Sequence, residues 1–218
     1  MQTINDACVD IECLVVGNIE NNVYIIGNGH TCFVVDPSDE VDTILEALGT
    51  RKLDAIVITH HHWDHMLAAY DLREATGAVV IAPAIDAPYI ENQELANRDM
   101  RKKKACPVDQ PVSDGDIVSI GTMAWKALAT PGHTKGSMCF FIAPEFGNHP
   151  QGAPVLISGD TLFKGTIGRT DFEDGSMDDM RASLKKLALL PDETIVLPGH
   201  NEQTVIGAER KRVFAAFA

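Results

Sequence analysis

The amino-acid sequence predicts a single mixed α/β domain over residues 1–218. A chain of 218 residues can bury a sizeable core, and its 45% hydrophobic and 22% charged residues are ordinary for a globular protein. Short apolar runs typical of strands are mixed with segments of helical periodicity in both halves of the chain. This mixture indicates sheets packed against helices.

The first half contains five segments that predict strands, each a short apolar run next to turn-forming residues. They are residues 9–16, 23–26, 31–35, 53–58 and 78–82. The sequence Gly27-Asn28-Gly29-His30 is a hairpin turn signal between the second and third. Helices are predicted at residues 39–48 with Ser38 or Asp39 as N-cap, at 67–74 ending near Gly77, and at 84–98 with a break around Pro88.

The second half has the same mixed character. Strands are predicted at residues 117–120, 124–129, 137–142, 154–157 and 194–197. Helices are predicted at residues 177–190, where Pro191 ends the helix, and at 204–213. Residues 144–152 are rich in proline and glycine and predict an exposed loop.

A run of histidines follows the predicted strand at residues 53–58. It reads His60-His61-His62-Trp63-Asp64-His65, an H-x-H-x-D-H pattern. Imidazole and carboxylate groups suit zinc, iron or manganese, and this tight spacing lets several of them converge. The run therefore predicts a metal site, and a solvated histidine-rich turn is the alternative.

Three further candidate ligands each lie beside a glycine at the end of a predicted strand. His133 follows Gly132, Asp160 follows Gly159, and His200 follows Gly199. A glycine lets the backbone approach a site closely, and a strand end holds a ligand on a rigid element. Five of the eight histidines are candidate ligands, either in these places or in the first run.

Taken in order, H-x-H-x-D-H followed by Gly-His, Gly-Asp and Gly-His resembles the metallo-β-lactamase fold superfamily. Residues 159–163, 168–172 and 197–200 are similar to the glyoxalase II-like hydrolases within it. The resemblance extends from about Leu14 to Arg210 and implies a four-layer αββα sandwich, the metallo-β-lactamase fold. It also implies a single-domain relative without the extra C-terminal helical domain of the longer glyoxalase II enzymes.

The resemblance implies two divalent metal ions, zinc first and iron or manganese as alternatives. The first ion would be held by His60, His62 and His133, the second by Asp64, His65 and His200, and Asp160 would bridge both. Asp64 and Asp160 are thus expected to serve catalysis as ligands, with a metal-bridging hydroxide as nucleophile. Asp36 is similar to an aspartate that supports the metal loop from behind, and a turn aspartate before Pro37 is the alternative.

A glyoxalase II-like enzyme would cleave a small acyl-thiol such as S-lactoylglutathione into a thiol and D-lactate. Arg169, and less strongly Lys164, are candidates for binding a substrate carboxylate. An ion pair of Arg169 with Asp171 or Glu173 is the structural alternative.

Other activities share these ligands. A persulfide dioxygenase would use one iron at His60, His133 and Asp160, and residues 168–172 resemble that family too. A lactonase of the same fold would share every ligand. A metal-binding sensor domain is the alternative outside enzymes. The native metal, the physiological substrate and the pathway stay open at this point.

The net charge of −13 argues against nucleic acid or an anionic membrane surface as a partner. No apolar segment is long enough to span a membrane, and the first ten residues do not resemble a signal peptide. Five scattered cysteines predict reduced thiols and therefore a cytoplasmic protein. We expect a monomer or homodimer. The basic run at residues 101–104 predicts a solvated face, or alternatively a patch that recruits an anionic thiol.

Overall fold

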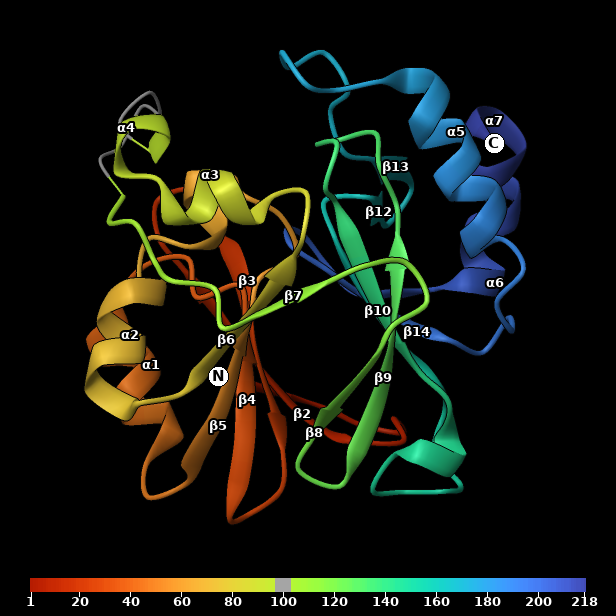
Figure 1. Ribbon diagram of the computed structural model, residues 1–218. Helices are drawn as coiled ribbons and strands as arrows, with labels where there is room; N and C mark the ends of the chain where they lie inside the picture. The colour runs from red at the N-terminus through yellow and green to blue at the C-terminus, as the bar shows by residue number, and fades with distance from the viewer. Residues whose placement is uncertain (97–102) are drawn as a thin grey trace.

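The computed structural model describes residues 1–96 and 103–218, and it contains two β-sheets packed face to face (Figure 1). Helices α1 (Val41–Leu48) and α2 (Ala69–Thr76) lie outside the first sheet, with α3 (Ala87–Glu91) and α4 (Gln93–Ala96) near its upper end. Helices α5 (Met177–Leu187), α6 (Ile206–Glu209) and α7 (Ala215–Phe217) lie outside the second. The fold is therefore the predicted four-layer αββα sandwich.

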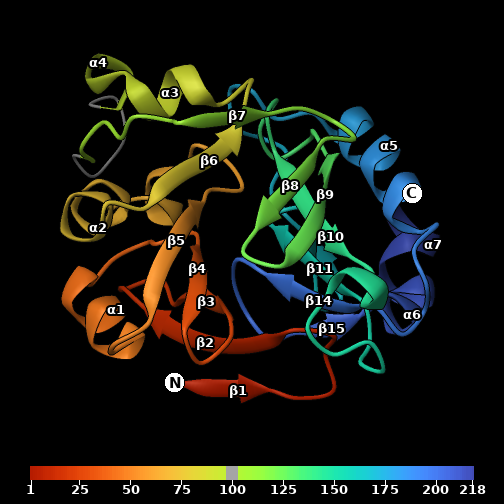
Figure 2. The same cartoon turned by 60° about the horizontal axis from the view of Figure 1, so that its bottom comes forward.

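The first sheet has seven strands in sequence order. They are β1 (Gln2–Ile4), β2 (Asp10–Val16), β3 (Asn21–Gly27), β4 (Thr31–Val35), β5 (Lys52–Val57), β6 (Val79–Pro83) and β7 (Gln110–Val112). Strands β1 to β4 are antiparallel, and Figure 2 shows β1 beside β2 at the edge of the sheet. Strands β4 to β7 are parallel, so their carboxyl ends lie along one edge.

The second sheet has six strands. Their spatial order is β15 (Thr204–Val205), β14 (Ile195–Pro198), β11 (Val155–Gly159), β10 (Met138–Ile142), β9 (Met123–Ala129) and β8 (Ile117–Ile120). Strand β10 is antiparallel to both β9 and β11, and β11 is parallel to β14. Strands β9, β11 and β14 therefore point the same way and end along one edge. A small hairpin, β12 (Leu162–Phe163) and β13 (Thr166–Ile167), follows β11.

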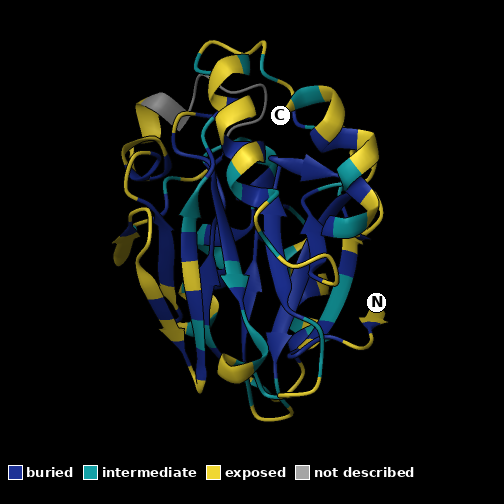
Figure 3. Ribbon diagram, turned by 90° about the vertical axis from the view of Figure 1, so that its right-hand side faces the viewer, coloured by how far each residue is buried: buried dark blue, intermediate teal, exposed yellow. Residues whose placement is uncertain are grey.

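Three apolar clusters hold the four layers together. The central cluster lies between the sheets and includes Phe33 and Trp125, whose rings meet edge to face at 5.5 Å. A second cluster joins the first sheet to α1 and α2, and a third joins the second sheet to α5 and α6. Figure 3 shows the strands mostly buried and the exposed residues gathered on helices and loops.

Most predicted elements are present, but two local predictions in the first half are wrong. Helix α1 follows Glu40 rather than Ser38 or Asp39, because the left-handed Glu40 occupies the N-cap position. Pro88 lies in the first turn of α3, where its missing N–H needs no partner, and the break falls instead at the extended residue Asn92. The last two residues of that predicted helix, 97–98, lie outside the described residues.

The C-terminal segment also differs from the single helix predicted at residues 204–213. Its first two residues are β-branched and form β15, which pairs with β14. Helix α6, a π-helical turn (Arg210–Phe214) and α7 follow. Strands β1, β7, β12 and β13 have only two or three residues each and were not predicted. In the part of the chain that is described, no helix combines the length and apolar character that a membrane crossing requires.

All five cysteines are free thiols, and four of them are buried. Burial raises the pKa of Cys8, Cys13, Cys32 and Cys139 to about 11 and that of Cys106 to about 12. We expect a thiol reagent at pH 8 to modify at most the half-buried Cys13, and only slowly, while denaturant exposes all five thiols. Rapid modification of two or more thiols in the native protein would contradict this arrangement.

Candidate metal centre

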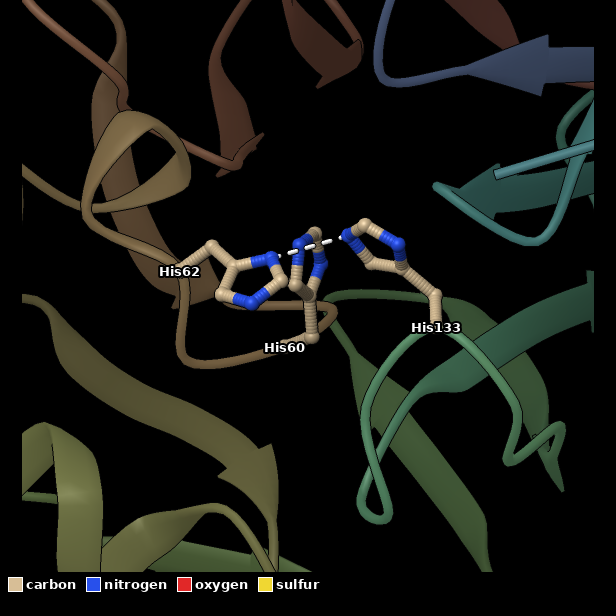
Figure 4. A group of neighbouring side chains, drawn as sticks. All are labelled: His60, His62 and His133. Carbon is tan, nitrogen blue, oxygen red and sulfur yellow. Dashed lines mark hydrogen bonds between the residues drawn. The ribbon is translucent and has the colours of Figure 1, made fainter. Parts of the chain in front are cut away.

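The candidate ligands follow the carboxyl ends of strands from both sheets, at the edge where the two sheets meet. Strand β5 leads into His60–His65, and β9, β11 and β14 lead into His133, Asp160 and His200. The contact between the two sides is direct, because His62 Nδ1 lies 2.8 Å from His133 Nε2 (Figure 4). The parallel directions of these strands thus explain why residues far apart in the sequence converge.

His60, His62 and His133 form the first group. One nitrogen of each ring lies within 4.8 Å of the others, and Figure 4 shows the three rings turned toward one another. His133 Nδ1 forms a hydrogen bond with the Arg169 carbonyl oxygen at 2.8 Å. This bond orients Nε2 of His133 toward His60 and His62.

Asp64, His65 and His200 form the second group, with one ligand atom of each again within 4.8 Å of the others. Asp64 Oδ2 lies 3.4 Å from His65 Nε2 and 3.3 Å from His200 Nε2. The sequence analysis missed Asn21, the first residue of β3, whose Nδ2 donates to Asp64 Oδ2 at 3.1 Å. Asn21 therefore orients this carboxylate from the first sheet.

Asp160 lies between the two groups. Its Oδ1 is 3.4 Å from His65 Nε2, and its Oδ2 is 3.4 Å from His133 Nε2 and 3.7 Å from His200 Nε2. Gly199 makes this packing possible, since a Cβ there would lie 2.5 Å from Asp160 Oδ1. All seven predicted ligands thus lie together.

The residues fit a pair of divalent cations. His60 Nε2, His65 Nε2 and Asp160 Oδ1 are buried and have no hydrogen-bond partner among residues 1–96 and 103–218. Buried polar atoms are nearly always satisfied, so three orphaned atoms on neighbouring ligands indicate a bound group. Imidazole and carboxylate donors suit zinc, iron or manganese.

The protonation states of the first group favour metal binding. Burial, reinforced by the neighbouring histidines, lowers the pKa of His60 well below its ordinary value and that of His62 to about 3. Both imidazoles are therefore neutral at pH 7 and offer a lone pair.

The second group behaves differently because carboxylates surround its histidines. Burial lowers the pKa of His65, but Asp160, Asp64 and Asp36 outweigh burial and raise it well above the ordinary value. Burial also lowers the pKa of His200, but the hydrogen bond to Asp64 and the charge of Asp160 outweigh burial and raise it above the ordinary value. A metal ion bound here must displace these protons.

Asp36 supports the second group from behind. It lies 2% exposed in the left-handed region, at φ 47°, just after β4. Its carboxylate accepts hydrogen bonds from Thr59 N at 2.8 Å and Thr59 Oγ1 at 2.7 Å, and it contacts His65 Nδ1 at 2.9 Å. Thr59, which the sequence analysis also missed, thereby connects Asp36 to the histidine run.

Of the two substrate-binding candidates, Arg169 lies at the rim of the centre. Arg169 donates from Nε and Nη2 to Asp171 at 2.9 Å each, and its guanidinium lies 4.4 Å from the centre of the Phe172 ring. Phe172 in turn meets His62 and His133 edge on, with ring centres 5.2 and 5.7 Å apart. Lys164 pairs with Glu202.

The basic run is only partly described, because Arg101 and Lys102 lie outside the described residues. Lys104 is exposed and pairs with Asp71. Lys103 is buried, and its Nζ donates to the His61 carbonyl oxygen at 2.6 Å, so the prediction of a solvated face is wrong at this residue.

Curated relatives are similar over most of the chain. A "Probable metallo-hydrolase YqgX" of Bacillus subtilis is 31% identical, covering 89% of this chain and 92% of that protein. A "Hydroxyacylglutathione hydrolase" of Pseudomonas entomophila is 37% identical over 78% of this chain, which spans only 56% of the Pseudomonas protein.

Two solved structures share the fold and the length. The "BLEG-1 B3 metallo-beta-lactamase" has a TM-score of 0.84 at 29% identity, covering 94% of this chain and 98% of that one. "TTHA1623 in a di-iron-bound form" has a TM-score of 0.78 at 31% identity, covering 92% and 98%. The family model of the metallo-beta-lactamase superfamily matches residues 16–200, which include all seven candidate ligands. The chain therefore belongs to the metallo-β-lactamase superfamily.

Proposed function

We propose that the protein is a metal-dependent hydrolase that cleaves a thioester such as S-lactoylglutathione, with His60, His62 and His133 holding one cation and Asp64, His65 and His200 the other. The observation that carries the proposal is the Asp160 carboxylate, which contacts histidines of both groups. Likeness to the Pseudomonas hydroxyacylglutathione hydrolase supports the substrate class. Zinc is the first choice of metal, and the di-iron form of TTHA1623 supports iron as an alternative.

The reaction adds water across the bond between the acyl carbon and sulfur, giving an acid and a thiol. Two divalent cations, when bound, polarise the acyl oxygen and lower the pKa of a shared water. The neutral imidazoles of His60 and His62 and the carboxylates of Asp64 and Asp160 belong to the ligand set. Thiolate is a good leaving group, so the site needs no separate acid to protonate it.

The substrate would lie against the Phe172 side of the centre, since this ring contacts two histidines of the first group and is partly exposed. An aromatic ring offers an apolar surface to the acyl group or the thiol carbon chain. Arg169 lies over the same ring and could donate to a carboxylate of the substrate from its rim position.

The test combines metal content with turnover on one sample. Metals per chain are counted by elemental analysis, and the same protein is assayed for thiol release from S-lactoylglutathione and for oxygen uptake with glutathione persulfide. We expect about two metals per chain, consistent with a two-metal hydrolase, together with thiol release. One iron per chain with oxygen uptake would replace the proposal by a persulfide dioxygenase.

Replacing Arg169 with alanine should raise KM for S-lactoylglutathione about tenfold and leave kcat nearly unchanged, because the side chain would bind the substrate equally in ground and transition states. Steady-state kinetics measures both constants. Arg181→Ala is the matched control, since Arg181 is also exposed and paired with an aspartate but lies on α5. An unchanged KM in the Arg169 variant would leave Arg169 with a structural role, through its contacts with Asp171 and Phe172.

A further inference from the structure

Asp86 lies immediately before α3, where an aspartate side chain commonly caps a helix. Its carboxylate makes no capping hydrogen bond to α3, although the residue is only 1% exposed. Burying a carboxylate is costly unless polar partners replace the lost water. Its partners therefore indicate what this residue does.

The partners of Asp86 belong to the two loops that carry the first group. Asp86 Oδ2 accepts a hydrogen bond from the backbone N–H of His61 at 2.9 Å and another from Thr134 Oγ1 at 3.0 Å. His61 lies between His60 and His62, and Thr134 directly follows His133. One oxygen atom thus connects the His60–His62 pair to the His133 loop.

His61 is held on its other sides as well. Its carbonyl oxygen accepts from Lys103 Nζ at 2.6 Å, and its ring stacks on Tyr89 with centres 4.6 Å apart. His61 Nδ1 lies 3.0 Å from the same Asp86 oxygen. Because peptide geometry joins His61 to both neighbours, restraining His61 also restrains His60 and His62.

The Asp86 carboxylate has little freedom to move. A Cβ on Gly136 would lie only 1.9 Å from Asp86 Oδ1, so the carboxylate packs directly against the backbone of the His133 loop. Only glycine fits at this position, and the contact supports the connection that the hydrogen bonds make.

We propose that Asp86 is a positioning residue that fixes the distance between the His60–His62 pair and His133, and so sets the affinity of the first metal group. The inference rests on the metal centre and not on the substrate. None of the hydrogen bonds of Asp86 among residues 1–96 and 103–218 reaches Asp64, His65 or His200. Loss of the Asp86 carboxylate should therefore weaken the binding of one metal ion and leave the affinity for the other unchanged.

Chelator competition with zinc, without substrate, measures the two affinities separately. Asp86→Ala should weaken one zinc by about 10- to 100-fold, the usual range for residues that orient metal ligands. Asp86→Asn keeps an oxygen that can accept both bonds and should recover most of that loss. Asp109→Ala is the matched control, because Asp109 accepts from Val80 N and Arg73 at the opposite end of β6.

Combined variants identify which metal is affected. Adding Asp86→Ala to His133→Ala should cause little further loss of zinc affinity. Adding it to His200→Ala should leave both sites with weakened zinc affinity. The His61 amide should also lose hydrogen-exchange protection in metal-free Asp86→Ala. If this variant does not fold, Thr134→Val removes one of the two donors and should still weaken the same zinc several-fold.

Wild-type affinities in the folded variants would overturn the proposal. Equal weakening of both zinc ions without recovery in Asp86→Asn would do so too, since it would indicate a general structural role. Absence of thioester hydrolysis would affect only the proposed function, because these measurements need no substrate.

Discussion

Replacing Asp160 with alanine should abolish hydrolysis and reduce the metal content from about two ions per chain to one or none. Asp160 contacts His65, His133 and His200, so the change removes the carboxylate that belongs to both groups. A loss of kcat on the order of a thousandfold or more is expected when charge stabilisation and metal retention fail together. Elemental analysis and the thiol-release assay measure the two effects on one preparation.

Asp160→Asn separates the charge of this side chain from its shape. The amide fills the same space but cannot balance two cations, so we expect it to lose activity nearly as completely as alanine. Asp178→Ala provides the control, because this exposed carboxylate belongs to α5 and pairs with Arg181. An alanine variant at position 160 that kept both metals would overturn its bridging role.

Replacing Asp36 with alanine should have the second largest effect, and it should act on stability before metal is added. Thr59 N, Thr59 Oγ1 and His65 Nδ1 would lose their shared acceptor inside the protein. Buried groups without partners cost about 1–3 kcal/mol each, so we expect a loss of roughly 3–5 kcal/mol of unfolding free energy. Urea unfolding of the metal-free protein measures this loss.

The left-handed backbone at residue 36 requires its own control. Asn tolerates this conformation better than alanine and retains one acceptor, so Asp36→Asn should lose about half as much stability. Loss of less than about 1 kcal/mol in the alanine variant would show that the three donors find other partners.

The clustering of the seven candidate ligands could be predicted because their signal is local. H-x-H-x-D-H fits within six residues, and each of the other three ligands lies beside a glycine at a strand end. Strands β4 and β5 were predicted to within a residue, because parallel strands buried on both faces are continuous apolar runs.

The residues that hold the ligands could not be predicted because their partners are distant. Asp86 lies 25 residues from His61 and 48 from Thr134, and Asn21 lies 43 from Asp64. In the sequence, Asp86 resembles an ordinary helix cap and Asn21 a turn residue. Strand β7 depends in the same way on pairing with β6, since three residues have no recognisable period.

The placement of the ligands on both sheets has a consequence for the whole fold. His62 and His133 are 71 residues apart, and each group combines side chains from the two sheets. A bound cation would therefore form a reversible cross-link between the two sheets, much as a disulfide closes a long loop. In a chain whose five cysteines are all free, this cross-link would add about 4 kcal/mol to the free energy of unfolding when the free metal concentration is a thousandfold above Kd. The melting temperature of the protein should then rise with the free metal concentration. The protein would be stable when zinc is abundant and would unfold more readily when zinc is depleted.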